Sequence, residues 1–397
     1  MRRLTKATRW SQRFRSFSPP YLSSIHCGTM SRLVNGVKSF STTASSLLAD
    51  ATAPTARSSF QVFRDVPSIR GLRRQLLQKD RTVGFVPTMG ALHEGHLSLI
   101  RQAARENTDI FVSIFVNPTQ FGVTEDLSSY PRTWDSDVAK LEQLNEELAR
   151  LGENSASAGR ITALFAPTSK AMYPGSPPSS EVNGDGSFVT ITPLAGKLEG
   201  GSRPVFFRGV ATVCMKLFNI TTPDRVYFGQ KDVQQTVVIK RMVEDFHVGS
   251  EVRIVETARE HDGLALSSRN VYLGDRRRTV GLTIYKALKA AEDQYAAGKT
   301  SRADILGAAQ TLATSVLAEQ QDLSPSERAI YEVDYISLAD PDTLDEVDIV
   351  DPSRGAILST AFKMAPLEES KPGEDCGLGD GKVPVRLIDN LILHPRA

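Results

Sequence analysis

Short apolar runs alternate with longer amphipathic stretches along the chain from about residue 61. Most of these runs are apolar at consecutive positions, which is typical of parallel strands that are buried on both faces. The stretches between them have the length and periodicity of crossover helices. The pattern therefore predicts an α/β fold with a mostly parallel sheet. The predicted strands are 83–86, 110–116, 161–165, 225–228 and 252–255, and the predicted helices are 133–151, 209–220 and 232–246.

The pattern changes after about residue 274. Two helical stretches precede three strand-like runs, and this order predicts a small α+β domain. The helical stretches are 276–297 and 302–320, and the runs are 331–338, 356–363 and 383–388. We therefore expect a disordered leader at 1–60, a catalytic domain at 61–273 and a C-terminal domain at 274–397. Segments dense in Gly, Pro, Ser or acidic residues predict a surface insertion at 173–187 and a mobile loop at 368–382.

The first part of the chain is basic. Residues 1–49 contain eight Lys or Arg residues and no acidic residue, and they are rich in Ser. This composition is typical of a mitochondrial transit peptide. The alternatives are a disordered basic leader and an extension upstream of the in-frame Met30, and a cytoplasmic protein would be expected in either case.

The rest of the chain is acidic. Taking those eight from the 47 basic residues leaves 39 against 46 acidic residues, which is a formal charge of −7. This charge gives no general attraction for a nucleic-acid backbone. No run of about 18 apolar residues predicts a membrane span. Three scattered cysteines without a CxxC spacing predict neither a disulfide framework nor a structural zinc site, which favours an intracellular protein.

A histidine pair marks the first candidate site. Segment 86–97 follows a predicted strand and begins a predicted helix, where α/β folds bind phosphate groups through backbone N–H groups and the helix dipole. His93 and His96 would lie on one face of this helix, where imidazole can donate to phosphate oxygens. Gly90 and Gly95 would let the backbone approach a nucleotide. Taken alone, the pair is only a candidate nucleotide site, since a helix start with two incidental histidines has the same pattern.

Further blocks of sequence resemble one enzyme family. The His-x-x-His pair at this place is the signature of adenylate-forming nucleotidyltransferases related to class I aminoacyl-tRNA synthetases. The other blocks follow in the order of the pantothenate synthetases, and the resemblance spans residues 61–393. These blocks are 115–122, 130–133, 229–235, 262–270 and 387–390. The resemblance implies a Rossmann-like parallel-sheet nucleotidyltransferase domain with a smaller C-terminal α+β domain.

The resemblance also implies an activity and its partners. The family joins pantoate to β-alanine through a pantoyl-adenylate intermediate, so that the expected small molecules are ATP as a substrate, pantoate, β-alanine and Mg²⁺. Neither a nucleic acid nor a membrane is expected as a partner. Members of the family are homodimers, and we expect the same here.

Several residues of these blocks have chemistry that suits ATP. Lys231 can offset phosphate charge, and Asp232 can accept from ribose hydroxyls or cap the next helix. By resemblance, His93, His96, Lys231 and Arg269 are catalytic. The residues expected to contact ATP are Met89, Gly90, Ala91, Leu92, His93, Glu94, Gly95, His96, Gly229, Gln230, Lys231, Asp232, Ala258, Leu266, Ser267, Ser268 and Arg269.

Uncharged amides suit a hydroxy acid whose groups must be oriented without proton transfer. By resemblance, Gln120 and Gln235 hold pantoate, and Gln120 also contacts β-alanine. Asn117 and Arg203 are expected beside the organic substrates. Phe206 stands three positions beyond Arg203, where the family commonly has His.

The metal prediction depends on one carboxylate. The family's paired acids near the metal correspond here to Ser136 and Asp137. Asp137 alone is therefore expected to position Mg²⁺, through water.

Two other functions are compatible with parts of the pattern. Another adenylyl-transferring enzyme would be a pantetheine-phosphate adenylyltransferase, which lacks an amine-accepting half-reaction, or a small synthetase that charges RNA, which should carry a basic surface. A catalytically inactive nucleotide-binding or regulatory module should have lost a histidine, Lys231 or Arg269, and all are present.

Overall fold

The computed structural model describes residues 59–122, 127, 130–154 and 158–396. They belong to a unit that spans residues 56–397. The predicted leader at 1–60 therefore falls almost entirely outside the described residues.

The apolar runs form a six-stranded sheet in which all neighbouring strands are parallel. The strand order is β1-β4-β3-β2-β5-β6, which confirms the predicted parallel α/β fold. The strands are β1 (Gln61–Phe63), β2 (Val83–Thr88), β3 (Asp109–Ile114), β4 (Arg160–Phe165), β5 (Arg225–Gly229) and β6 (Glu251–Val255). The longer helices that connect them are α1 (Val66–Gln78), α2 (Glu94–Glu106), α3 (Trp134–Asn154), α6 (Phe206–Thr221) and α7 (Val233–Asp245).

Helices cover both faces of this sheet because its strands are apolar on both sides. In β2, Phe85 belongs to a buried cluster with residues of α1, α6 and α7. The next residue, Val86, belongs to a second cluster with residues of α2 and α3. Both side chains are fully buried. The alternation of a strand therefore divides the core into two layers, one on each face of the sheet.

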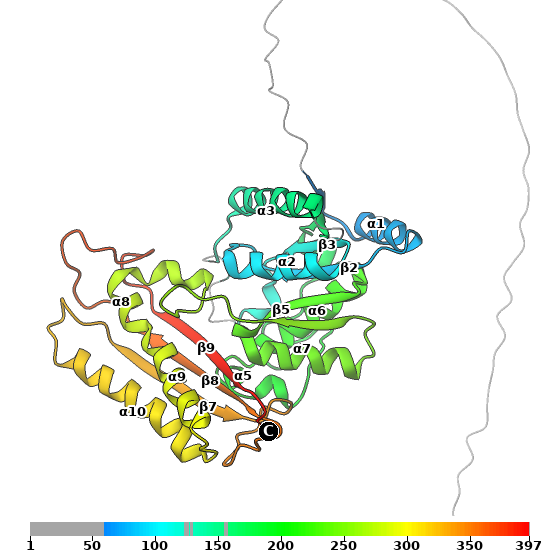
Figure 1. Ribbon diagram of the computed structural model, residues 1–397. Coiled ribbons are helices and arrows are strands. Elements are labelled where there is room, and N and C mark those ends of the chain that lie inside the picture. The colour runs from blue at the N-terminus through cyan, green and yellow to red at the C-terminus, as the bar shows by residue number, and fades with distance from the viewer. Residues whose placement is uncertain (1–58, 123–126, 128–129, 155–157, 397) are drawn as a thin grey trace, which may run out of the picture. The chain divides into compact units, whose positions relative to one another are not determined.

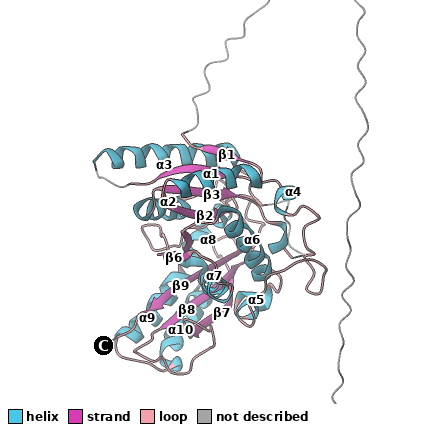
Figure 2. Ribbon diagram, turned by 90° about the vertical axis from the view of Figure 1, so that its right-hand side faces the viewer, coloured by secondary structure: helices cyan, strands magenta, loops and turns pink. Residues whose placement is uncertain are grey.

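A second sheet follows in the chain. It is antiparallel, in the order β7-β8-β9, and α9 and α10 pack along it (Figure 1). Figure 2 shows its strands as a group apart from β1, β2 and β3. The elements are α8 (Gly274–Gly281), α9 (Thr283–Ala296), α10 (Arg302–Gln321), β7 (Tyr331–Ala339), β8 (Ala356–Met364) and β9 (Val385–Leu393). The predicted helix 276–297 is thus two helices that meet at Leu282, and the domain boundary at 273/274 stays a prediction.

Short elements lie in the loops, and the two predicted irregular segments are irregular. The short elements are η1 (Pro118–Gln120), α4 (Ser169–Met172), η3 (Leu194–Gly196), α5 (Glu199–Ser202), η4 (Gln230–Asp232) and η5 (Ser268–Tyr272). The segment predicted as a surface insertion begins with a buried residue, Tyr173, and so is not wholly on the surface. In the segment predicted as a mobile loop, Glu374 forms an ion pair with Arg276 of α8. Among the helices of the described residues, none is both long and apolar enough to cross a bilayer.

The strand order has a switch point beside β2. The chain passes from β2 to β3 on one side, whereas β5 pairs with β2 on the other. Loops that leave two such neighbouring strands diverge and leave a crevice at their carboxyl ends. The histidine block follows β2 and the Lys231 block follows β5, so that both open onto this crevice.

Candidate functional site

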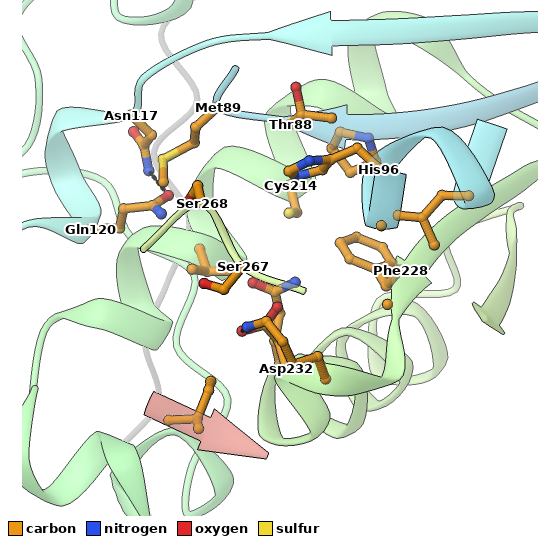
Figure 3. A pocket seen from close by; sticks show the side chains of 18 of the residues that line it. Thr88, Met89, His96, Asn117, Gln120, Cys214, Phe228, Asp232, Ser267 and Ser268 are labelled. Carbon is orange, nitrogen blue, oxygen red and sulfur yellow. Dashed lines mark hydrogen bonds and ion pairs between the residues drawn. The ribbon is translucent and has the colours of Figure 1, made fainter. Parts of the chain in front are cut away.

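A cleft with a volume of about 270 Å³ lies at the carboxyl ends of the parallel strands. Its lining comes from the ends of β2, β3, β5 and β6, from α6, and from Ile388 on β9. Figure 3 shows Asn117 and Gln120 at one end of the cleft and His96 and Phe228 at the other. Most of the predicted site residues line it. They are Met89, His93, Gly95, His96, Asn117, Gln120, Arg203, Gly229, Lys231, Asp232, Gln235, Ala258, Leu266, Ser267, Ser268 and Arg269.

The two histidines are fixed by the backbone at the start of α2. His93 is the N-cap residue, and its Nδ1 accepts from the backbone N–H of Gly95 at 3.1 Å. The Nδ1 of His96 accepts from the backbone N–H of His93 at 3.4 Å. Because each Nδ1 is an acceptor, each neutral ring carries its proton on Nε2. A Cβ at Gly95 would lie 2.8 Å from the ring of His93, so glycine makes this close arrangement possible.

The environment keeps both histidines neutral. Burial and, to a smaller extent, the charge of Lys231 together lower the pKa of His93 to about 4. Burial likewise lowers the pKa of His96 to about 3, with a smaller effect from His93, whose ring centroid lies 4.2 Å away. The pair therefore consists of two neutral Nε2–H donors at neutral pH. Such donors can meet the charge that develops on a phosphate oxygen.

The amide end of the cleft is fixed by a hydrogen-bond network. The Nδ2 of Asn117 donates to Oε1 of Gln120 at 3.0 Å and to the carbonyl of Gly209 at 3.2 Å. The Oδ1 of Asn117 accepts from the hydroxyl of Tyr173 at 2.7 Å. Since Oε1 of Gln120 is held in this way, its Nε2–H₂ group is the end that can donate to a ligand. Asn117 thus orients Gln120, and Tyr173 orients Asn117.

Cationic and hydroxyl side chains border the middle of the cleft. The Nζ of Lys231 lies 3.2 Å from Oδ1 of Asp232. The loop that carries Arg269 returns along residue 258, where the N–H of Leu266 donates to the carbonyl of Ala258 at 2.9 Å. Positive charge beside hydroxyl groups is the arrangement that suits a polyphosphate.

Arg203 is held at the border of the cleft by an acid and a ring. Its Nη1 lies 2.8 Å from Oε1 of Glu199, and its guanidinium stacks 3.8 Å from the ring centroid of Phe206. Arg386 on β9 contacts the same Glu199 oxygen at 2.9 Å. The aromatic residue that departs from the family's usual His therefore provides a cation–π contact for this arginine.

Five residues predicted to contact ATP do not border the cleft. Gly90 has a φ of +85°, which turns the chain before α2. The backbone N–H groups of Ala91 and Leu92 donate to Asp137, and the Leu92 side chain is buried in the core. Glu94 forms an ion pair with Arg101, and Gln230 bonds to Asn390. These positions act in local structure, whereas their neighbours His93 and Lys231 border the cleft.

Asp137 does not fit a metal site. Its Oδ1 accepts from the N–H of Leu92 at 2.8 Å and its Oδ2 from the N–H of Ala91 at 2.9 Å. The hydroxyl of Thr133 also contacts Oδ2 at 3.1 Å. The residue is 1% exposed. Within the described ranges, no group of three or more His, Cys, Asp or Glu side chains is arranged to hold a metal ion. The prediction that Asp137 positions Mg²⁺ is therefore not supported; this carboxylate anchors the turn before α2.

A family model described as pantoate-beta-alanine ligase matches residues 61–392. The chain belongs to this family. The match covers both sheets, and so it includes β9, from which Ile388 reaches the cleft.

Similar proteins agree with this assignment. The pantoate–beta-alanine ligase of Saccharomyces cerevisiae is 39% identical over 341 residues, which cover 84% of this chain and 100% of the yeast protein. The pantothenate synthetase of Thermus thermophilus has a similar structure, with a TM-score of 0.65 and 35% identity over 84% of this chain and 99% of that one. A pantoate-beta-alanine ligase from Francisella tularensis, complexed with beta-gamma ATP and beta-alanine, has a TM-score of 0.57 and 29% identity over 84% of this chain and 98% of that one.

Sequence reasoning gave no role to several residues that support the site. Gln234 is buried next to Gln235, and its Nε2 donates to the carbonyls of Leu194 and Lys197 at 2.9 and 2.6 Å. Adjacent glutamines in a helix look equivalent in the sequence, so only the packing separates the one that faces the cleft. Asn390 is fully buried under the Lys231 loop. It lies in a block that resembles the family, and this was the only signal for it.

Proposed function

We propose that this member of the pantoate-beta-alanine ligase family condenses pantoate with β-alanine at the expense of ATP. The observation that carries the proposal is one cleft with two kinds of lining. Neutral imidazole donors, Lys231 and Arg269 suit the phosphates of ATP, whereas Gln120 and Gln235 suit a hydroxy acid. The Francisella tularensis ligase, which is similar in structure and is complexed with beta-gamma ATP and beta-alanine, supports the choice of ligands.

The first step forms an acyl-adenylate. An oxygen of the pantoate carboxylate attacks the α-phosphorus of ATP, and the bond to the bridging oxygen breaks as pyrophosphate leaves. His93 and His96 donate through Nε2–H as charge builds on the phosphate oxygens, and Lys231 and Arg269 offset the charge of the leaving group. No covalent enzyme intermediate is needed, because positioning and charge stabilisation lower the barrier.

The second step uses the amine. The neutral amino group of β-alanine attacks the acyl carbon of pantoyl-adenylate, the bond to the phosphate oxygen breaks and AMP leaves. The amine loses a proton as the amide forms. Gln120 and Arg203 border the region where this substrate would lie, and we assign its carboxylate to Arg203.

Magnesium belongs to this proposal only as a companion of the nucleotide. The buried Asp137 is committed to backbone N–H groups, so we assign it no part in binding the ion. Phosphate oxygens of ATP are themselves good ligands for Mg²⁺.

Product analysis of the purified protein tests the proposal. With ATP, Mg²⁺, pantoate and β-alanine, AMP should accumulate, and its formation should require both organic substrates. With β-alanine left out, pyrophosphate should still be released once per active site as pantoyl-adenylate forms. AMP that forms without either substrate, or no AMP at all, would refute the assignment.

Assembly and location are further parts of the proposal. We propose a homodimer, which light scattering of the purified protein would test against its monomer mass of 43.4 kDa. We also propose that the basic residues 1–49 direct the chain to mitochondria. A fluorescent reporter fused to residues 1–60 should then enter mitochondria, and a reporter that stays in the cytosol would exclude this role.

A further inference from the structure

We infer that Asn390 and Asp389, two adjacent residues of β9, are positioning residues that hold the two phosphate-side loops of the cleft. The inference rests on the proposed function for the identity of the nucleotide. Neither residue lies on a loop that borders the phosphates. Both belong to the antiparallel sheet, and yet each is bonded to a different catalytic loop of the parallel one.

Asn390 forms hydrogen bonds with the loop that carries Lys231. Its Nδ2 donates to two successive backbone carbonyls, those of Gln230 and Lys231, each at 2.9 Å. Its Oδ1 accepts from Nε2 of Gln230 at 3.2 Å. The side chain is 0% exposed and does not line the cleft. All the hydrogen-bonding groups of this amide therefore bond to the loop, so a change here acts on a ligand through this loop and its Lys231.

Asp389 forms an ion pair with the segment that leads to Arg269. Its Oδ2 and Oδ1 lie 2.6 and 2.9 Å from Nη1 and Nη2 of Arg259, which is a bidentate pair. Arg259 also donates to the carbonyl of Gly263 at 3.0 Å, and its guanidinium stacks 4.4 Å from the ring centroid of Tyr285 on α9. Arg259 is adjacent to the cleft residue Ala258, where the returning loop is bonded. The orientation of the Ser267–Arg269 loop thus depends on a carboxylate of β9.

These contacts set the separation of the two loops. The peptide bond between Asp389 and Asn390 is rigid. The loops that carry Lys231 and Arg269 are therefore held by the same short piece of β9. Nucleotidyl transfer requires the cations at fixed distances from the phosphates, and an error of about 1 Å can reduce a rate about 100-fold. A buried amide and a buried carboxylate with complete hydrogen bonding keep the two loops in fixed positions.

The test measures ATP affinity by calorimetry with ATP alone, and kcat/KM by AMP release, in the full chain. Asn390→Ala should weaken ATP binding about 10-fold and lower kcat/KM by about 10- to 100-fold. In a Lys231→Ala background the same substitution should change ATP affinity less than about twofold, because the group through which Asn390 acts is gone. Asp389→Asn should show the same dependence on Arg269→Ala.

A matched control separates positioning from folding. Asn145 is also a buried asparagine with backbone partners, since its Nδ2 donates to the carbonyl of Ile161 at 3.1 Å and its Oδ1 accepts from the N–H of Ile161 at 2.8 Å. It does not border the cleft. Asn145→Ala should lower the unfolding stability, as Asn390→Ala does, and leave ATP affinity unchanged.

The outcomes separate a failure of the proposed function from a failure of the positioning role. Wild-type protein that binds ATP but makes no AMP would overturn the proposed function and leave the affinity test of positioning in place. Active wild type together with an Asn390→Ala variant of normal ATP affinity would overturn the positioning role. So would a loss of the same factor in the Lys231→Ala background, because the two residues would then act independently.

Discussion

The Nδ1 atoms of His93 and His96 accept hydrogen bonds from the protein and are not available to a ligand. Both accept backbone N–H groups at the start of α2, and so the ligand meets only the Nε2–H side of each ring. One side chain therefore caps a helix and donates to a substrate at the same time. These two tasks use different atoms, and substitutions can separate them.

Replacement of His93 by Asn or by Gln should give opposite results. The Oδ1 of Asn can take the place of Nδ1 as the cap acceptor, whereas Asn has no group at the place of Nε2. We expect His93→Asn to keep nearly the wild-type stability and to lose activity by about 100- to 1,000-fold. His93→Gln should lose about 1 kcal/mol of stability and keep more activity. Urea unfolding and AMP release measure the two properties, and equal losses of activity in both variants would contradict the division of tasks.

The same burial should make stability depend on pH. The pKa values of His93 and His96 are lowered to about 4 and about 3, compared with about 6.5 in an unfolded chain. Between these values the unfolded chain binds more protons. The stabilisation is therefore fully present above about pH 6.5 and is lost as the pH falls, by at most about 1.4 kcal/mol per pH unit for each histidine.

Urea unfolding between pH 7 and pH 4.5 checks this pH dependence. A His93→Asn/His96→Asn double variant lacks both groups, so its stability should fall less steeply with pH than that of the wild type. Parallel curves for the two proteins would mean that the histidines are not buried in the neutral form.

Sequence predicted the residue types of the site better than their exact contacts. His93, His96, Lys231 and Arg269 border one cleft, as the blocks of sequence suggested. Asp137 was expected beside a metal, and it binds backbone N–H groups instead. A carboxylate oxygen can accept from an N–H group or bind a cation. The sequence does not show which of these the neighbouring backbone will favour.

Helix α6 reaches the site through a close contact of backbone with backbone. A Cβ at Gly209 would lie 2.3 Å from the carbonyl oxygen of Thr119 and 2.5 Å from Cα of Gln120. Because no side chain stands between them, α6 can support η1 and the Gln120 amide directly.

Gly209→Ala should therefore damage both fold and site. The added methyl group must push η1 away, which we expect to cost about 1–3 kcal/mol and to raise the KM for pantoate. The matched control is Gly307→Ala in α10, where a Cβ would meet nothing within 4 Å. That change should stabilise the protein by about 0.5–1 kcal/mol, as expected for a glycine inside a helix. A Gly209→Ala variant with wild-type stability and KM would contradict the close contact.

At the level of elements, the periodic segments were predictable and the short ones were not. All five predicted strands of the parallel sheet occur. The sixth strand, β1, was not predicted because its three residues are too few to show a period. The pattern predicts one helix over 276–297, whereas the structure divides this segment at Leu282 into α8 and α9. Gly281, the last residue of α8, packs closely against β9, since a Cβ there would lie 3.0 Å from the side chain of Leu387.

An ion network links the cleft to the second sheet across the molecule. Arg386 of β9 contacts Glu199 of α5 at 2.9 Å and Asp334 of β7 at 2.9 Å. The contact with Glu199 is an ion pair rather than an aligned hydrogen bond. All three side chains are less than 20% exposed. Loss of the shared cation would leave each of the two acids with one remaining cationic partner, Arg203 for Glu199 and Lys363 for Asp334, in a largely buried place.

Arg386→Met should lower the free energy of unfolding by about 2 kcal/mol at pH 7, because both acids lose one of their two cationic partners. The control is Arg354→Met. Arg354 also contacts two acids, Asp340 and Asp342, but it is 49% exposed, and its loss should cost less than about 1 kcal/mol. Urea unfolding measures both variants. Equal costs would show that the burial of the Arg386 network has no energetic effect.

Strand β9, which carries Arg386, Asp389 and Asn390, is the last strand of the described fold. Asn390 and the Lys231 that it secures are 159 residues apart in the chain. During synthesis, a ribosome completes the loops that carry Lys231 and Arg269 well before it makes β9. A chain released early would contain His93, His96, Lys231 and Arg269 without the strand that we propose holds the loops of the last two. If β9 has the positioning role that we propose, translation to the end of this strand is a condition for efficient formation of the adenylate, and an incomplete chain would consume little ATP.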